Sequence, residues 1–288
     1  MATAVQFGAG NIGRGFLGEL FYRSGLETVF IEINEDLVKA LNQARRYEIE
    51  IRDEAGNYPI PVENVRAVLA SDEDAVAEEV ARAEIAATAV GVAALPQVAP
   101  LIAKGLVRRF SSPGSEPLNI IICENLLHSA DYMRKEINKH IPEKLRPDIN
   151  KRLGLSEAVV SRMVPLVTEE ERRQSPLYIA AEKYARLPVD AKGFVGEIPE
   201  IYGLKPVDNI TAFQEQKLFT HNLGHALTAY FGYEKGYVYI YQAVADEEIK
   251  KKVLAALAES GEALVKKHPI TREEQEAHIA DLLAVSAA

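Results

Sequence analysis

The stretch FGAGNIGRGF, residues 7–16, decides the fold class of this chain. Its glycines Gly8, Gly10 and Gly13 have the spacing G-x-G-x-x-G, after an apolar run typical of a buried strand and before a helical pattern that stops at Gly25. In such a strand–turn–helix unit the first glycine permits a tight turn and the second lets backbone approach a pyrophosphate. The third lets helix and strand pack closely. The alternative is a glycine-rich turn that binds nothing.

Two further features favour a dinucleotide site. Free N–H groups at the start of the helix would face the anion, which makes Asn11 and Ile12 candidate cofactor-binding residues. The next strand pattern, ETVFIEIN at 27–34, contains Glu32 about 20 residues beyond the glycines, where a carboxylate accepts hydrogen bonds from ribose hydroxyls. Glu32 would also repel a 2′-phosphate, so NAD is expected rather than NADP. The alternative for Glu32 is a solvated acid at the end of a strand.

Composition limits the class of protein. The 288 residues are 48% apolar and include one cysteine, Cys123, which excludes an intrachain disulfide and a cysteine-rich metal site. A net charge of −9 with no basic stripe argues against a nucleic-acid partner. No apolar run reaches the about 18 residues of a membrane span, and no targeting signal opens the chain. We therefore expect a soluble, cytoplasmic protein with no membrane partner.

The order of the secondary-structure patterns predicts two domains. Strand and helix patterns alternate in the first part of the chain, which is typical of a mostly parallel sheet covered on both faces. The segment 47–62 interrupts this order as a predicted hairpin that turns at Ala55–Asn57. We predict an α/β chain with a Rossmann-type, doubly wound NAD-binding domain over residues 1–195. A mainly α-helical substrate and catalytic domain follows over residues 196–288.

The helical part carries a second candidate site in KLFTHNLGHA, residues 217–226. At 3.6 residues per turn, Asn222 lies about 140° and His225 about 80° around the helix axis from Lys217, so the three could line one concave wall. Apolar neighbours lower the pKa of a lysine and suit it to acid–base catalysis near neutral pH. The same spacing also fits an alternative without a catalytic site. In that alternative the Lys217 ammonium reaches solvent, Asn222 interrupts the helix and His225 is a hydrogen-bonded core residue.

Three motifs together resemble the polyol-specific long-chain dehydrogenase/reductase family, also called the mannitol dehydrogenase family. They are FGAGNIGRGF at 7–16, CENLLHSA at 123–130 and KLFTHNLGHALTAYFG at 217–232. The resemblance extends over nearly the whole chain and is strongest for the branch that acts on phosphorylated sugars. It implies NAD-dependent, metal-independent hydride transfer between D-mannitol 1-phosphate and D-fructose 6-phosphate.

The resemblance also implies roles for individual residues. Lys217 would be the general base for alcohol oxidation and the general acid for ketone reduction. Asn222 and Asn125 would form a hydrogen-bonding site around the reacting oxygen, and His225 would bind and orient substrate hydroxyls. His221 and His225 are four residues apart, as in some metal sites, but no acid stands between them as in HExxH, so no metal is expected.

Several expectations remain more open. Arg14, at the start of the first helix, is the candidate for binding the substrate phosphate, although it could equally serve the cofactor. Glu124 is interpreted as a solvated or supporting group. The resemblance also implies that the helical domain is shorter here than in other family members, and it leaves monomer and dimer open. The alternative functions are a mannitol 2-dehydrogenase, a hexuronate reductase or a weakly active NAD-binding sensor.

Overall fold

The computed structural model describes residues 2–53, 56–111, 114–165 and 167–287. The chain divides into two compact units, Met1–Asp208 and Asn209–Ala288. The division comes later than the expected one after residue 195. The reason is that strand β11 (Leu204–Val207) pairs in parallel with β10 (Leu187–Asp190), which keeps the segment leading to β11 in the first unit.

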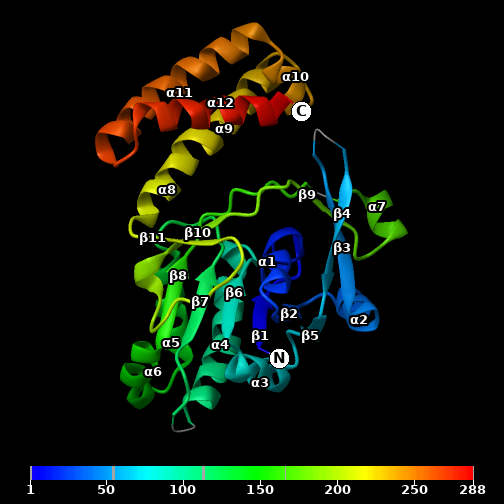
Figure 1. Ribbon diagram of the computed structural model, residues 1–288, viewed down its shortest axis with the longest axis vertical. Coiled ribbons are helices and arrows are strands. Elements are labelled where there is room, and N and C mark those ends of the chain that lie inside the picture. The colour runs from blue at the N-terminus through cyan, green and yellow to red at the C-terminus, as the bar shows by residue number, and fades with distance from the viewer. Residues whose placement is uncertain (1, 54–55, 112–113, 166, 288) are drawn as a thin grey trace. The chain divides into compact units, whose positions relative to one another are not determined.

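A six-stranded parallel sheet forms the centre of the N-terminal unit (Figure 1). Its order, β5-β2-β1-β6-β7-β8, is that of a doubly wound dinucleotide-binding fold, so the predicted fold class is confirmed. The order reverses between β1 and β6, and folds of this kind bind ligands at that point, outside the carboxyl ends of the strands. The strands are β1 (Thr3–Phe7), β2 (Glu27–Glu32), β5 (Val65–Leu69), β6 (Ile85–Thr88), β7 (Leu118–Ile122) and β8 (Leu153–Glu157).

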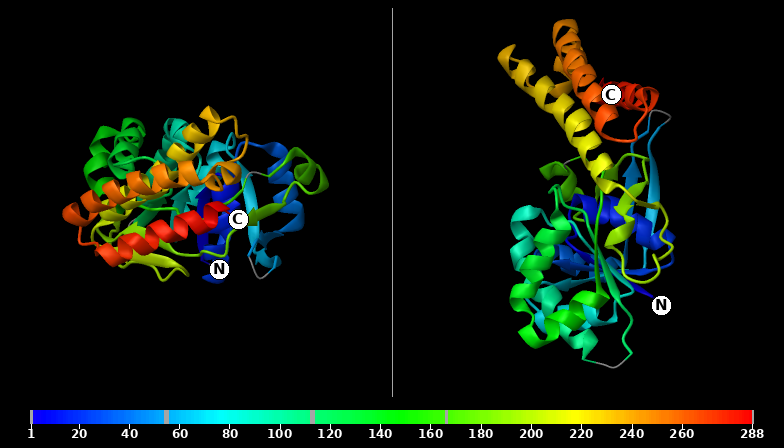
Figure 2. Two further views of the ribbon diagram at one scale, coloured as in Figure 1. Left: turned by 90° about the horizontal axis from the view of Figure 1, so that it is seen from above. Right: turned by 90° about the vertical axis from the view of Figure 1, so that its left-hand side faces the viewer.

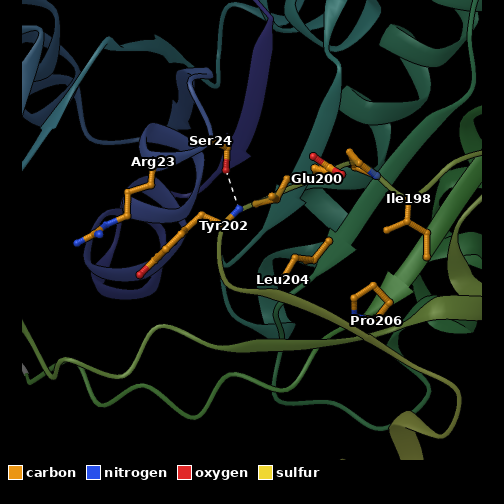
Figure 3. Close-up of a pocket in the computed structure, with 9 residues that line it drawn as sticks. Arg23, Ser24, Ile198, Glu200, Tyr202, Leu204 and Pro206 are labelled. Atoms are coloured by element: carbon orange, nitrogen blue, oxygen red, sulfur yellow. Dashed lines mark hydrogen bonds between the residues drawn. The ribbon is translucent and has the colours of Figure 1, made fainter.

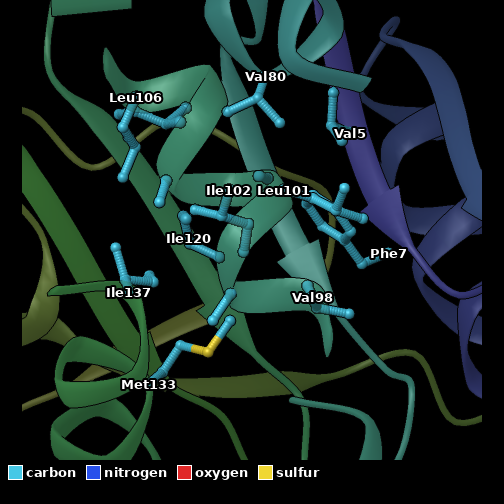
Figure 4. Close-up of a cluster of buried hydrophobic side chains, with 14 of the residues drawn as sticks. Val5, Phe7, Val80, Val98, Leu101, Ile102, Leu106, Ile120, Met133 and Ile137 are labelled. Atoms are coloured by element: carbon cyan, nitrogen blue, oxygen red, sulfur yellow. The ribbon is translucent and has the colours of Figure 1, made fainter. Parts of the chain in front are cut away.

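Helices cover both faces of this sheet, because successive strand residues point to opposite sides. Val5 and Phe7 of β1 pack in one buried cluster with α3, α4 and α5 (Figure 4), whereas Ala4 packs in another cluster with α1. Both sides of the sheet are therefore apolar, as a doubly wound fold requires. The helices of this unit are α1 (Gly18–Arg23), α2 (Glu35–Ala44), α3 (Glu73–Arg82), α4 (Leu95–Phe110), α5 (Ser129–His140), α6 (Arg146–Arg152) and α7 (Glu169–Gln174).

The predicted hairpin is confirmed as β3 (Arg46–Ile51) and β4 (Tyr58–Glu63), which pair antiparallel. Strand β9 (Ile179–Ala181) joins β3 in parallel and completes a separate three-stranded sheet. The predicted turn begins at Ala55, which lies outside the described residues.

The C-terminal unit is helical, as predicted. Its α-helices are α8 (Ile210–Gln216), α9 (Leu223–Glu234), α10 (Ile240–Val244), α11 (Glu247–Lys267) and α12 (Arg272–Ala287). Helix α11 packs against both α9 and α12 (Figure 2), and its residues Ile249, Val253 and Leu257 form the centre of the unit's core. Among the described residues, no helix combines the length and apolar character that a membrane span needs.

Candidate functional site

The glycine loop follows β1 at the point where the sheet order reverses. Gly8 has a φ of +90°, and its N–H donates to the Ile31 carbonyl at 2.8 Å. A Cβ at this position would lie 2.6 Å from the Ala89 carbonyl oxygen. Only glycine fits both the left-handed conformation and this close approach to the segment after β6.

The other two glycines of the motif differ in the space around them. A Cβ at Gly13 would lie 2.0 Å from the Gly8 carbonyl oxygen, so this glycine lets the first helix pack directly on the loop. Nothing lies within 4 Å of a Cβ built at Gly10, which leaves its backbone open to a ligand. Asn11 and Ile12 begin the helix at this point. A tight turn, an open second glycine and a helix start together fit a pyrophosphate cradle.

Glu32, at the end of β2, is fastened to the glycine loop. Its Oε2 accepts a hydrogen bond from the Ala9 N–H at 2.9 Å, and its Oε1 accepts from the N–H groups of Ile33 and Asn34 at 2.8 and 3.0 Å. A carboxylate offers about four acceptor sites, so these three bonds leave capacity for a ribose hydroxyl. The structure therefore brings Glu32 and the glycine motif together in one place.

Arg14 has a different environment from the expected one. Its side chain is buried, with Nε donating to the Ala9 carbonyl at 2.7 Å and Nη1 to the Leu177 carbonyl at 2.9 Å. A guanidinium engaged with two backbone carbonyls inside the protein supports the glycine loop, and its role toward a phosphate stays a prediction. The contact with Leu177 is long-range, and no local pattern could have indicated it.

Glu124 has the second of its two predicted roles, that of a supporting group. It is 8% exposed, and its two carboxylate oxygens accept hydrogen bonds from the N–H groups of Val90 and Gly91, each at 2.9 Å. It therefore fixes the loop after β6. The next residue, Asn125, is exposed beyond the carboxyl end of β7. The sequence signal for this clamp is a carboxylate directly after the apolar run IIIC, residues 120–123.

Cys123 directly precedes Glu124 in the sequence. It is buried and forms no disulfide. Burial raises the pKa of its thiol far above the ordinary value, and the nearby Glu124 charge acts in the same direction. A thiol that stays protonated is a poor nucleophile, so Cys123 is an inert core residue.

The C-terminal candidate residues lie on an unusual helical turn. The segment Lys217–Asn222, between α8 and α9, is a π-helix, and the Leu223 N–H bonds five residues back to the Leu218 carbonyl. The predicted separation of about 140° between Lys217 and Asn222 is therefore wrong, because it assumed regular α-helical geometry. Because hydrogen bonds in a π-turn join residues five apart, Lys217 and Asn222 lie nearer to one side of the helix than regular α-helical geometry would place them. Single π-turns within α-helices are frequent at functional sites.

Two candidate groups on this helix have altered pKa values. Burial lowers the pKa of the Lys217 ammonium, because the charged form loses hydration. The same loss of hydration lowers the pKa of His225, on α9. Lys217 is thereby moved toward the range in which a lysine can exchange protons near neutral pH.

The neighbouring His221 contacts a second histidine. Its ring packs edge-on against that of His278 in α12, with centroids 4.5 Å apart. In the part of the chain that the structure describes, no three His, Cys, Asp or Glu side chains are grouped to hold a metal ion.

A surface pocket of about 490 Å³ lies elsewhere in the N-terminal unit (Figure 3). Arg23 and Ser24 at the end of α1 line it together with Tyr202, whose N–H donates to the Ser24 hydroxyl at 2.8 Å. The first helix leads from the glycine loop to Arg23, so this pocket is at the opposite end of the helix from the cradle. We assign it no function.

Comparison with known proteins gives matches over both units. The mannitol dehydrogenase Rossmann domain matches residues 2–203, and the mannitol dehydrogenase C-terminal domain matches residues 209–284. Mannitol-1-phosphate 5-dehydrogenase of Bacillus velezensis is 38% identical over 282 residues, which are 97% of this chain and 73% of that protein. The Bacillus subtilis enzyme of the same name is 37% identical over 284 residues, again 97% of this chain and 73% of that protein.

Solved structures agree on the fold. Mannitol 2-dehydrogenase of Pseudomonas fluorescens, in a ternary complex with NAD and D-mannitol, matches with a TM-score of 0.83 at 14% identity over 99% of this chain and 68% of that one. A D-sorbitol dehydrogenase matches with a TM-score of 0.82 at 17% identity, covering 99% of this chain and 69% of that one. With both family domains and these sequence identities, the chain belongs to the mannitol dehydrogenase family of oxidoreductases.

Proposed function

We propose that this protein is an NAD-dependent mannitol-1-phosphate 5-dehydrogenase, which interconverts D-mannitol 1-phosphate and D-fructose 6-phosphate without a metal. The observation that carries the proposal is the 38% identity over 97% of the chain to an enzyme of that name. The altered pKa of Lys217 and its place on a π-turn support the acid–base part of the proposal.

The N-terminal unit supplies the cofactor-binding residues of this proposal. Gly8, Gly10 and Gly13 would let the loop and helix start, with Asn11 and Ile12, hold the pyrophosphate. Glu32 would accept hydrogen bonds from the adenosine ribose. Bound NAD supplies the hydride acceptor for oxidation and, when reduced, the hydride donor. The open space at Gly10 and the acceptor capacity left on Glu32 are the features that fit this cofactor.

The C-terminal unit supplies the proton chemistry. In alcohol oxidation the carbinol carbon loses its hydrogen with two electrons, and neutral Lys217 takes the hydroxyl proton at Nζ. In ketone reduction protonated Lys217 returns that proton to the oxygen. Asn222 donates a hydrogen bond to the reacting oxygen, a role we also propose for Asn125, and His225 orients substrate hydroxyls. Arg14 remains the candidate for the substrate phosphate, because the two carbonyls it contacts use only part of the five N–H donors of its guanidinium.

One assay tests the proposal: NADH oxidation with fructose 6-phosphate, with fructose and with no sugar. Charge-assisted contacts to a phosphate contribute roughly 1.5–3 kcal/mol each, so two of them should raise kcat/KM for fructose 6-phosphate by about 10²-fold or more over fructose. Equal values for the two sugars would instead indicate a mannitol 2-dehydrogenase. NADH binding without turnover of either sugar would indicate a hexuronate reductase or a binding protein. An assay with a hexuronate distinguishes these two, because only the reductase would oxidise NADH with it.

A further inference from the structure

One buried glutamine of α12 contacts the π-turn from outside it. The Gln275 Nε2 donates to the Thr220 hydroxyl at 2.9 Å, and its Oε1 accepts from the Gln216 Nε2 at 3.0 Å. Gln275 is 2% exposed and Thr220 is fully buried. Gln216 directly precedes Lys217 and Thr220 lies inside the turn, so the two bonds attach to the chain on either side of the lysine.

Helix α11 supports the same turn. The Ser260 hydroxyl donates to the Phe219 carbonyl at 2.7 Å, which satisfies a backbone oxygen of the π-helical segment. The next residue, Gly261, lets Gln275 come close, because a Cβ there would lie 3.1 Å from the Gln275 Cγ. The turn thus receives side-chain hydrogen bonds from two different helices.

These contacts are specific to the geometry of the turn. A π-turn has one residue more than the α-helical turn it replaces, so its formation shifts every later residue around the axis. The Gln275 amide donates one of these hydrogen bonds and accepts the other. A buried amide that lost either partner would keep its desolvation cost without compensation, so the network resists any change of register.

We propose that Gln275 is a positioning residue, which holds the π-turn through Gln216 and Thr220 in the register that places Lys217 and Asn222 on one side. The inference rests on the proposed acid–base role of Lys217. Gln275 itself touches neither reacting atoms nor cofactor in this proposal. It acts on where the proton-transferring group and its amide neighbour lie.

Loss of the network has a defined consequence. If the segment relaxed to regular α-helix, Asn222 would turn away from Lys217, and a small displacement of a catalytic group can reduce turnover about 10²-fold. Water that entered beside the turn would also rehydrate the ammonium, whose pKa is lowered by burial. Binding of NADH, which we assign to the N-terminal unit, would be unaffected.

The test compares Gln275→Leu with the wild type in fructose 6-phosphate reduction as a function of pH. We expect kcat to fall about tenfold or more, the KM for NADH to stay within twofold, and the alkaline midpoint of kcat to move to higher pH. The matched control is Gln242→Leu in the same unit. The Gln242 Oε1 accepts hydrogen bonds from the N–H groups of Val238 and Tyr239, at the start of α10, so this variant should lower Tm and leave kcat and the pH midpoint unchanged.

The proposal is overturned if Gln275→Leu lowers Tm as the control does but retains the wild-type kcat and pH midpoint. Thr220→Val removes the accepting hydroxyl with little change of shape, and it carries the same expectation should Gln275→Leu fail to fold. Lys217→Ala distinguishes failure of the proposed function from failure of the proposed role of Gln275. If Lys217→Ala retains turnover, the proposed function fails. If Lys217→Ala is inactive and both network variants are normal, only the role of Gln275 fails.

Discussion

The Glu32 carboxylate accepts a hydrogen bond from the Ala9 N–H at 2.9 Å, which joins the end of β2 to the glycine loop after β1. Two further N–H groups, of Ile33 and Asn34, hold the other carboxylate oxygen. The negative charge is therefore fixed in position beside the loop instead of moving on an exposed side chain.

This fixed charge predicts the choice of nicotinamide cofactor. Wild-type enzyme should use NADH at least tenfold more efficiently than NADPH in kcat/KM, because a 2′-phosphate would approach an immobile carboxylate. Glu32→Gln should reduce that preference. Glu35→Gln, which neutralises an exposed acid in the first turn of α2, should leave the preference for NADH unchanged. Equal use of NADPH by the wild type would contradict the role given to Glu32.

The glycines predict a contrast between folding and binding. Gly13→Ala forces a methyl group to 2.0 Å from the Gly8 carbonyl oxygen, so it should cost several kcal/mol of stability, about the upper end for single substitutions. Gly10→Ala meets no protein atom within 4 Å and should change stability by less than about 1 kcal/mol. It should nevertheless weaken NADH binding, because its methyl group occupies the ligand's space. Thermal denaturation and NADH titration of both variants check this, and unchanged NADH affinity in Gly10→Ala would be evidence against the cradle.

Removal of the lysine amine tests the proton transfer. Lys217→Ala should lower kcat for fructose 6-phosphate reduction by about 10²-fold or more, the usual effect of losing a general acid, while the Kd for NADH changes little. Lys251→Ala removes an exposed lysine of α11 and should retain wild-type kcat. Near-normal turnover by Lys217→Ala would contradict the acid–base role and would leave Lys217 as a lysine whose ammonium extends to solvent.

The lowered pKa of Lys217 also predicts opposite pH dependences for the two directions. Alcohol oxidation needs the neutral amine, so its kcat should rise with pH through a midpoint below the ordinary lysine value of 10.5. Ketone reduction needs the ammonium, so its kcat should fall through the same range. Steady-state rates in both directions measure these midpoints. A midpoint at or above the ordinary lysine value would contradict the assignment.

A stability measurement provides an independent check of the same group. Because the folded-state pKa lies below the unfolded one, the unfolded chain binds the proton more tightly, and stability rises with pH between the two values. Below the folded-state pKa the buried charge is at its most unfavourable. Lys217→Met should therefore be more stable than wild type at neutral pH, with a gain that shrinks as the pH approaches 10.5. Lys251→Met should show no such pH-dependent gain in chemical denaturation.

Much of the fold could be predicted from local patterns. Strand and helix periodicities reflect which side of an element is buried, and the glycine spacing reflects backbone geometry within one turn, so both are legible in a short stretch of sequence. The candidate residues Glu32, Lys217, Asn222 and His225 were found in the same way, by their position after a strand or along a helix. The division between the two units, after residue 208, comes 13 residues later than the predicted one after residue 195, because pairing of β10 with β11 joins segments that no local pattern relates.

The sequence by itself determined the doubly wound fold, the glycine loop and the identity of the candidate acid–base residues. Only the tertiary structure decided the burial of Arg14 against the Leu177 carbonyl and the clamp that Glu124 forms on Val90. It also decided the π-turn at Lys217, which Gln275 contacts from a helix distant in sequence. The physical reason is the range of the forces. Backbone sterics and hydrophobic periodicity act between near neighbours in the chain, whereas a buried hydrogen bond is formed by whatever partner the packed fold brings within about 3 Å.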